Sequence, residues 1–177
     1  YRRYKEVQVA ANKRKIDKQW IDRGSIEWIS ARLKDRLEAP QFGICHGTRR
    51  GQEQAWFREF LDFDVIGTEI SDSAKDFPHT IEWDFHEVKR EWISACDLIY
   101  SNSWDHSYNP DKMFRRWMSC VKPGGVMVLT HTGAHNIVSE TDPFGVTLDE
   151  LCAMIGEIGG ASWEIDVPDG APDVVTT

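Results

Sequence analysis

Polar or conformationally special residues follow the short apolar segments that the sequence predicts as strands. Segment 41–45 leads into a turn with Gly47 and Gly51 at its ends, and segment 64–68 is followed by Glu69. Glycines let a backbone approach a ligand closely, and a carboxylate after the second strand of a βαβ unit can bind ribose hydroxyls. The pattern is typical of a nucleotide-binding edge, although an ordinary βα turn with a solvated Glu69 would have the same sequence.

Three later segments end in the same way. An acidic-aromatic pair, Asp84-Phe85, closes the segment 80–85, a polar and aromatic loop follows the apolar segment 95–101, and His131 follows 126–130. In an open α/β sheet, ligands bind outside the carboxyl ends of the strands. A functional group at each of five strand ends therefore predicts one ligand site at that edge.

The elements that must position these groups alternate between strand and helix. This alternation predicts an α/β protein with a Rossmann-like, doubly wound, mostly parallel sheet of about six to seven strands and helices on both faces. Helices are expected over 52–61, over 87–94, after Asn109-Pro110 and after a capping box at 147–150. We expect a tight turn at 121–125, a sixth strand over 161–167 and the start of a seventh at Asp173.

Residues 1–40 are expected to form an N-terminal helical arm packed on a single domain, 41–177. Gly24 is expected to break the arm, and Ser25 to cap a second helix. From residue 1 to 36 there are eleven Lys/Arg against five Asp/Glu, so the arm carries +6 and the remainder −14. A basic arm of this kind is a solvated helix face or, alternatively, a partner-binding element.

The net charge, the cysteine spacing and the hydrophobic pattern argue against several classes of function. The net charge of −8 argues against a nucleic-acid binder. The four cysteines have no paired close spacing, so neither a zinc site nor a disulfide framework is expected, no metal is predicted, and a reducing, cytoplasmic location fits. The sequence has no apolar run of transmembrane length, and nothing in it indicates an oligomeric state.

Five stretches carry a resemblance to a known family: GICHGTRRGQE, VIGTEIS, EWDFHEV, CDLIYSNSWDH and VKPGGVMVLTH, together covering about 41–132. With these, the chain resembles the class I S-adenosylmethionine-dependent methyltransferases, and most of all their type 11 branch. The resemblance implies that S-adenosyl-L-methionine is the cofactor and S-adenosyl-L-homocysteine the product. For such an enzyme, the acidic net charge favours a small molecule or a glycan over nucleic acid as the acceptor.

The resemblance also implies roles for individual residues. The turn residues would carry the methionine part of the cofactor and Glu69 would hold the ribose. Asp84 would reach the adenine amino group, with Phe85 packing beside it or presenting its backbone amide. Ser101 and Asn102 would line the floor near the sulfonium. The turn residues are Gly47, Thr48, Arg49 and Gly51.

On the acceptor side, the resemblance places Asp105 and His106. If the acceptor is a hydroxyl, His106 or His131 could serve as the base, and Asp105 could orient His106 or act as the base itself. The alternative for each histidine is a structural hydrogen bond in its loop.

Two positions depart from the family pattern. Arg49 stands where a third, central glycine is usual, and Cys45 stands where an acidic residue is common. Arg49 would pair with the cofactor carboxylate or point into solvent. These departures keep open a second function, a non-catalytic S-adenosylmethionine-binding regulator. A nicotinamide-dependent oxidoreductase is a third, but the turn lacks the G-x-G-x-x-G order.

Overall fold

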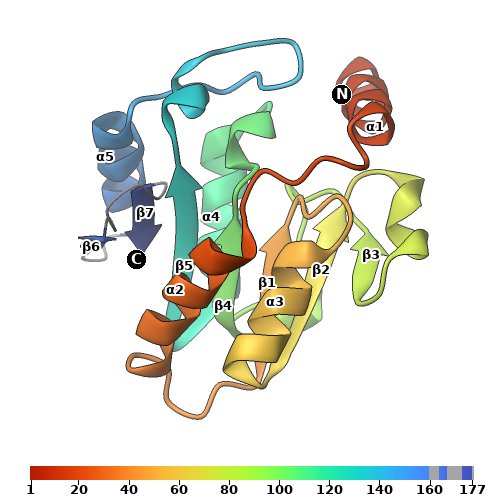
Figure 1. The fold of residues 1–177 in the computed structure, drawn as a ribbon. Coiled ribbons are helices and arrows are strands. Elements are labelled where there is room, and N and C mark those ends of the chain that lie inside the picture. The colour runs from red at the N-terminus through yellow and green to blue at the C-terminus, as the bar shows by residue number, and fades with distance from the viewer. Residues whose placement is uncertain (160–163, 167–172, 177) are drawn as a thin grey trace.

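The computed structural model describes residues 1–159, 164–166 and 173–176. Its centre is a seven-stranded sheet in the order β3-β2-β1-β4-β5-β7-β6, and Figure 1 shows it from the side of α2 and α3. Neighbouring strands from β3 to β5 are parallel, whereas β7 runs antiparallel to both β5 and β6. The strands are β1 Phe42–His46, β2 Asp64–Glu69, β3 Thr80–Glu82, β4 Cys96–Ser101, β5 Val121–His131, β6 Glu164–Asp166 and β7 Asp173–Thr176.

Helices cover both faces of the sheet, as expected for a doubly wound fold (Figure 1). Alternate residues of the central strands face opposite layers: Ile44 and Ile99 join the core beneath α4 and α5, whereas Cys45 and Tyr100 join the core beneath α2 and α3. The predicted Rossmann-like fold is confirmed. The helices are α1 Arg2–Arg14, α2 Arg23–Lys34, α3 Gln52–Leu61, α4 Pro110–Cys120 and α5 Leu148–Gly159.

Two helix starts follow the sequence signals. Asn109 caps α4 by accepting a hydrogen bond from the Lys112 amide at 3.1 Å, with Pro110 at the first helical position. At α5, the Thr147 amide donates to the Glu150 carboxylate at 2.8 Å, and the Glu150 amide donates back to the Thr147 hydroxyl at 3.3 Å. Both of these predicted caps are confirmed.

The start of α2 was predicted wrongly. The cap is Asp22, whose carboxylate accepts a hydrogen bond from the Ser25 amide at 2.7 Å. A carboxylate three residues before that amide satisfies the orphan donor of the first turn. Gly24 and Ser25 therefore lie within the first turn of the helix.

The predicted turn at 121–125 is instead the first part of β5. Cys96 pairs with Val121 but Leu98 pairs with Val126, so a β-bulge absorbs the extra residues. Gly124 takes the positive φ of 82° that this bend needs. A Cβ on Gly125 would lie 2.6 Å from the Cys96 carbonyl oxygen.

Two other predictions are adjusted by the structure. The expected helix over 87–94 shrinks to one 3-10 turn, Arg90–Trp92. The predicted sixth strand is described only over Glu164–Asp166, because 161–163 and 167 lie outside the described residues. The seventh strand, β7, is confirmed.

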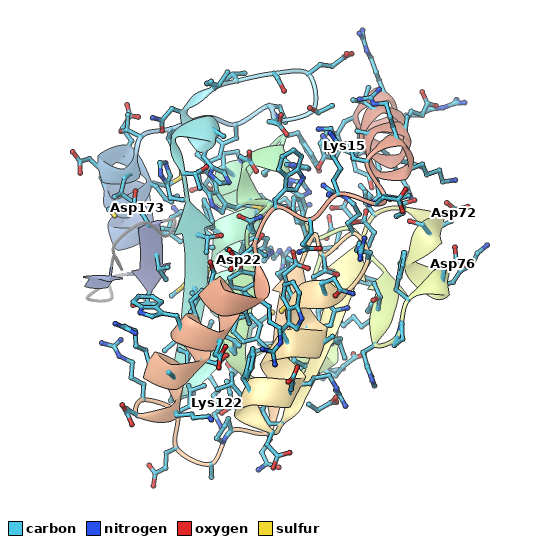
Figure 2. The ribbon with its side chains drawn as sticks, in the orientation of Figure 1. Lys15, Asp22, Asp72, Asp76, Lys122 and Asp173 are labelled. Atoms are coloured by element: carbon cyan, nitrogen blue, oxygen red, sulfur yellow. The ribbon has the colours of Figure 1, made fainter. Side chains whose placement is uncertain are left out.

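The carboxyl ends of β1, β2 and β4 lie at the upper edge of the sheet in Figure 1, with α1 lying across that end of the molecule. Figure 2 shows Lys15, just past α1, near this edge, whereas Lys122 lies at the opposite end, where it pairs with Asp97. Strand order reverses between β1 and β4, and ligands bind at such a switch point. No helix in the described part of the chain is long and apolar enough to cross a membrane.

Candidate functional site

A pocket lies between the carboxyl ends of the strands and α1. The pocket is partly open to solvent. Its strand side is formed by Gly47, Arg49, Thr68, Glu69, Ile70, Trp83, Phe85, Ser103 and His106, and its helix side by Tyr4, Gln8, Ala11, Asn12 and Lys15. Four of the five strand ends that were predicted to converge, those of β1, β2, β3 and β4, thus line one pocket, whereas the end of β5 does not.

The turn after β1 has the backbone shape expected of a ligand-binding loop. Gly47 and Gly51 have φ values of 73° and 77°, a region that favours glycine. A Cβ on Gly47 would lie 2.8 Å from the Ser103 Cβ, which is too close. Arg49 also has a positive φ, 46°. The backbone is therefore left-handed at this position, where the family pattern has a central glycine.

The Arg49 side chain has a partner within the chain. Its Nη1 donates to the Lys18 carbonyl oxygen at 2.8 Å, and its guanidinium carbon lies 6.0 Å from the centroid of the Trp20 ring. This hydrogen bond joins the segment after α1 to the glycine turn, and Arg49 also lines the pocket.

Glu69 is buried at the end of β2, with 5% of its surface exposed. Its Oε2 accepts a hydrogen bond from the Arg49 amide at 3.0 Å, and its Oε1 accepts one from the Ser71 amide at 3.1 Å. Burial raises the pKa of this carboxyl above its usual value. The alternative of a solvated Glu69 is therefore wrong: the side chain is held by two amides and faces the pocket with lone pairs to spare.

The two residues of the acidic-aromatic pair after β3, Asp84 and Phe85, make different contacts. Phe85 lines the pocket and is 8% exposed. Asp84 accepts hydrogen bonds from the Tyr1 hydroxyl at 2.6 Å and the His86 amide at 2.9 Å, and its Oδ1 lies 2.7 Å from the His86 Nδ1. Burial opposes ionisation, but the hydrogen bonds from His86 and then Tyr1 outweigh it and lower the pKa of Asp84 to about 2. Asp84 thus ties α1 to this strand end.

At the end of β4, the pocket wall is formed by Ser103, a residue that was not predicted from the sequence. Ser101 is fully buried and donates to the His46 carbonyl oxygen at 3.1 Å, while the Asn102 side-chain oxygen accepts from the Thr130 hydroxyl at 2.8 Å. Ser103 lines the pocket and donates to the Gly47 carbonyl oxygen at 3.2 Å. Ser103 had no distinguishing signal, because it is one of several polar residues in this loop.

On the acceptor side, His106 borders the pocket. It ends a 3-10 turn, Trp104–His106, and its Nε2 lies 3.1 Å from the Asp142 Oδ1. The hydrogen bond from His106 holds the pKa of Asp142 well below its usual range. Asp105 is 8% exposed, and burial raises the pKa of its carboxyl. Of the three predicted catalytic residues, His106 is the one on the pocket wall.

His131 lies away from the pocket wall. It is 3% exposed, and its Nε2 lies 3.0 Å from the Val146 carbonyl oxygen. Its Nδ1 lies 3.9 Å from the Asp173 carboxylate on β7, and Figure 2 labels Asp173 on the side of the molecule away from α1. The structure therefore brings Asp105 and His106 towards the site but does not bring His131 there.

The residues of α1 that form the roof of the pocket were not predicted. Gln8 and Asn12 of α1 are 5% and 9% exposed, which is unusual for polar residues of a basic, solvated helix. Gln8 donates to the Thr141 carbonyl oxygen at 2.7 Å, and the Asn12 side-chain oxygen accepts from the Ser73 hydroxyl at 3.0 Å. The signal was available: Tyr4, Gln8 and Lys15 recur at helical spacing on one face.

Comparisons with known proteins agree on the architecture. No protein-family model and no curated protein sequence matches the chain. Solved structures do match. The chain is similar to the 1,6-didemethyltoxoflavin-N1-methyltransferase of Burkholderia thailandensis, which was crystallised with 1,6-didemethyltoxoflavin and S-adenosylhomocysteine, with a TM-score of 0.68, 16% identity, and coverage of 97% of this chain and 85% of that one.

Two further structures support the same assignment. A SAM-dependent methyltransferase from Archaeoglobus fulgidus matches with a TM-score of 0.67 and 11% identity over 88% of this chain and 93% of that one. The phosphoethanolamine N-methyltransferase 2 of Haemonchus contortus matches with a TM-score of 0.60 and 18% identity over 81% of this chain and 43% of that one. The chain has the fold of the class I S-adenosylmethionine-dependent methyltransferases.

Proposed function

We propose that the protein is an S-adenosylmethionine-dependent methyltransferase that acts on a small-molecule or sugar acceptor. The observation that carries the proposal is Glu69, a buried carboxylate that lines a pocket beside the glycine turn of this fold. A carboxylate at the end of the second strand is the group that accepts hydrogen bonds from ribose hydroxyls in nucleotide-binding sheets. The acidic net charge of −8 favours a small acceptor over nucleic acid.

The residues present fit an adenosyl cofactor. Glu69 has lone pairs left for the ribose, Phe85 offers an apolar wall for the adenine, and Gly47 brings backbone without a side chain to the pocket wall. When bound, the cofactor supplies an activated methyl group on a sulfonium. The tasks of the chain are to orient the acceptor in line with that methyl and to exclude water, and α1 covers the pocket for the second task.

The acceptor belongs on the side of His106. This imidazole lies on the pocket wall, and its Nε2 is hydrogen-bonded to Asp142 at 3.1 Å. A hydroxyl acceptor needs to lose its proton during transfer, and the His106 and Asp142 pair can take it. Asp105 lies behind this pair, with its Oδ1 3.9 Å from the His106 Nε2.

One observation favours a second function, a non-catalytic S-adenosylmethionine-binding regulator. Arg49 replaces the central glycine, and its guanidinium is already bonded to the Lys18 carbonyl oxygen beside the pocket. A turn tied to the segment after α1 could report cofactor occupancy to that segment. Turnover against a panel of hydroxyl and amine acceptors separates the two functions, because a regulator would bind the cofactor without consuming it.

Calorimetric titration with S-adenosylhomocysteine tests the premise that both functions share. We expect one equivalent to bind, and Glu69→Ala to weaken binding by ~1–3 kcal/mol, or about 5- to 150-fold in Kd, because hydrogen bonds to a charged group are lost. Glu69→Gln keeps the side-chain volume, and Asp111→Ala removes an exposed carboxylate that pairs with Arg115 on α4 as a control. Absence of binding at millimolar nucleoside, or preferential binding of NAD, would contradict the proposal.

A further inference from the structure

Three side chains with metal-binding chemistry converge next to the pocket: Asp105, His106 and Asp142. The first two end the 3-10 turn after β4, and Asp142 comes from the loop between β5 and α5. One ligand atom from each lies within 4.8 Å of the others. The sequence alone did not indicate this group, because Asp142 is distant from the other two along the chain.

The second observation is a buried carboxylate oxygen of Asp105 that lacks a hydrogen-bond partner. Asp105 is 8% exposed, and its Oδ1 is buried with no hydrogen-bond partner among the described residues. This oxygen lies 3.9 Å from the His106 Nε2 and 4.0 Å from the His135 Nε2. An unpaired, buried carboxylate oxygen is costly, so a ligand that pairs with it would be strongly favoured.

The spacing of the ligand atoms suits a cation. Bonds of about 2.1 Å in octahedral geometry place neighbouring ligand atoms about 3 Å apart and opposite ones about 4.2 Å apart. The His106 Nε2 lies 3.1 Å from the Asp142 Oδ1 and 3.9 Å from the Asp105 Oδ1. Small side-chain rotations would bring all three atoms to one centre. Two carboxylates and one imidazole form a mixed donor set that suits divalent first-row metals such as Mn²⁺ and Fe²⁺.

We propose that Asp105, His106 and Asp142 bind a divalent first-row cation at the edge of the pocket. Three protein ligands leave coordination positions open, and because His106 lines the pocket, the cation lies where an acceptor oxygen would bind. There it would bind the acceptor hydroxyl and lower the pKa of that group, so that the hydroxyl proton passes to water and His106 serves as a ligand in place of the base role given above. The bond from the acceptor oxygen to the methyl group then forms as the bond from that methyl group to the sulfonium sulfur breaks. This role in catalysis rests on the proposed function, but binding of the cation does not.

The probe is Mn²⁺ in the absence of any nucleoside. Its binding is measured as the loss of the free-ion signal in electron paramagnetic resonance. We expect one Mn²⁺ per chain, and at least a tenfold rise in Kd for each of Asp105→Asn and Asp142→Asn. Asp111→Asn is the matched control, since Asp111 is an exposed carboxylate that pairs with Arg115 on α4. The control should bind Mn²⁺ as the wild type does.

The bound ion also reports its ligands. Pulsed electron paramagnetic resonance should detect one coordinated imidazole nitrogen in the wild type and lose it in His106→Gln. If Asp105→Asn does not fold, Asp142→Asn and this nitrogen signal still decide the question, because Asp142 is partly exposed. Lack of stoichiometric binding, equal affinity in the carboxylate variants and the control, or no nitrogen coupling would overturn the proposal. Failure of the proposed function alone would show as Mn²⁺ binding without S-adenosylhomocysteine binding.

Discussion

Replacing Glu53 by glutamine should change how the stability of the protein depends on pH. Glu53 lies in the first turn of α3, directly after the glycine turn, and is 7% exposed. Its Oε1 accepts a hydrogen bond from the Gln19 side chain at 3.1 Å, but its Oε2 has no partner among the described residues. Burial raises the pKa of Glu53 from 4.5 to about 7.

The sign follows from linkage. The folded protein holds the proton of Glu53 more tightly than the unfolded chain does, so this group favours folding below pH 4.5 and loses that contribution as the pH rises through about 7. A difference of 2.5 between 4.5 and 7 corresponds to about 3 kcal/mol, because one pKa unit equals about 1.4 kcal/mol. Above pH 7, the folded state carries a buried, half-paired carboxylate.

Urea unfolding followed by tryptophan fluorescence at pH 5 and pH 8 measures this effect. Relative to the wild type, Glu53→Gln should gain up to about 3 kcal/mol in unfolding free energy between pH 5 and pH 8, because the amide carries no charge at either pH. Glu59→Gln removes an exposed carboxylate from the same helix and serves as the control. Parallel pH curves for wild type and Glu53→Gln would refute the reasoning.

Two further substitutions test the walls of the pocket. Gly47→Ala should destabilise the fold by about 1–3 kcal/mol, since φ is 73° and the new Cβ would meet the Ser103 side chain; urea unfolding checks this, and an unchanged midpoint would contradict it. Gln8→Ala should raise the Kd for S-adenosylhomocysteine by roughly 2- to 10-fold, because α1 loses its hydrogen bond to the Thr141 carbonyl oxygen. Calorimetry with the exposed Glu6→Ala as control checks this, and equal affinities would show that α1 is not the roof of the site.

Much of the fold could be predicted because local signals agree with the global arrangement. The caps at Asn109 and Thr147 use short-range hydrogen bonds that the sequence displays directly. The floor of the pocket followed from the rule that parallel strands end at one edge, which placed Gly47 and Glu69 together.

The rest depended on contacts between distant segments. The bulge that draws residues 121–125 into β5 is set by pairing with Cys96, and no local pattern distinguishes it from a turn. The burial of Gln8 and Asn12 depends on where α1 lies across the strand ends. Asp142 meets His106 through a long loop, so the cluster beside the pocket was not visible in the sequence.

A crystal structure of the protein with S-adenosylhomocysteine bound would test the central claim most directly. The ribose hydroxyls should donate to the Glu69 carboxylate, the adenine should lie against Phe85, and the sulfur should face His106 beneath α1. Nucleoside bound elsewhere on the surface, with Glu69 still contacting just the Arg49 and Ser71 amides, would contradict the account.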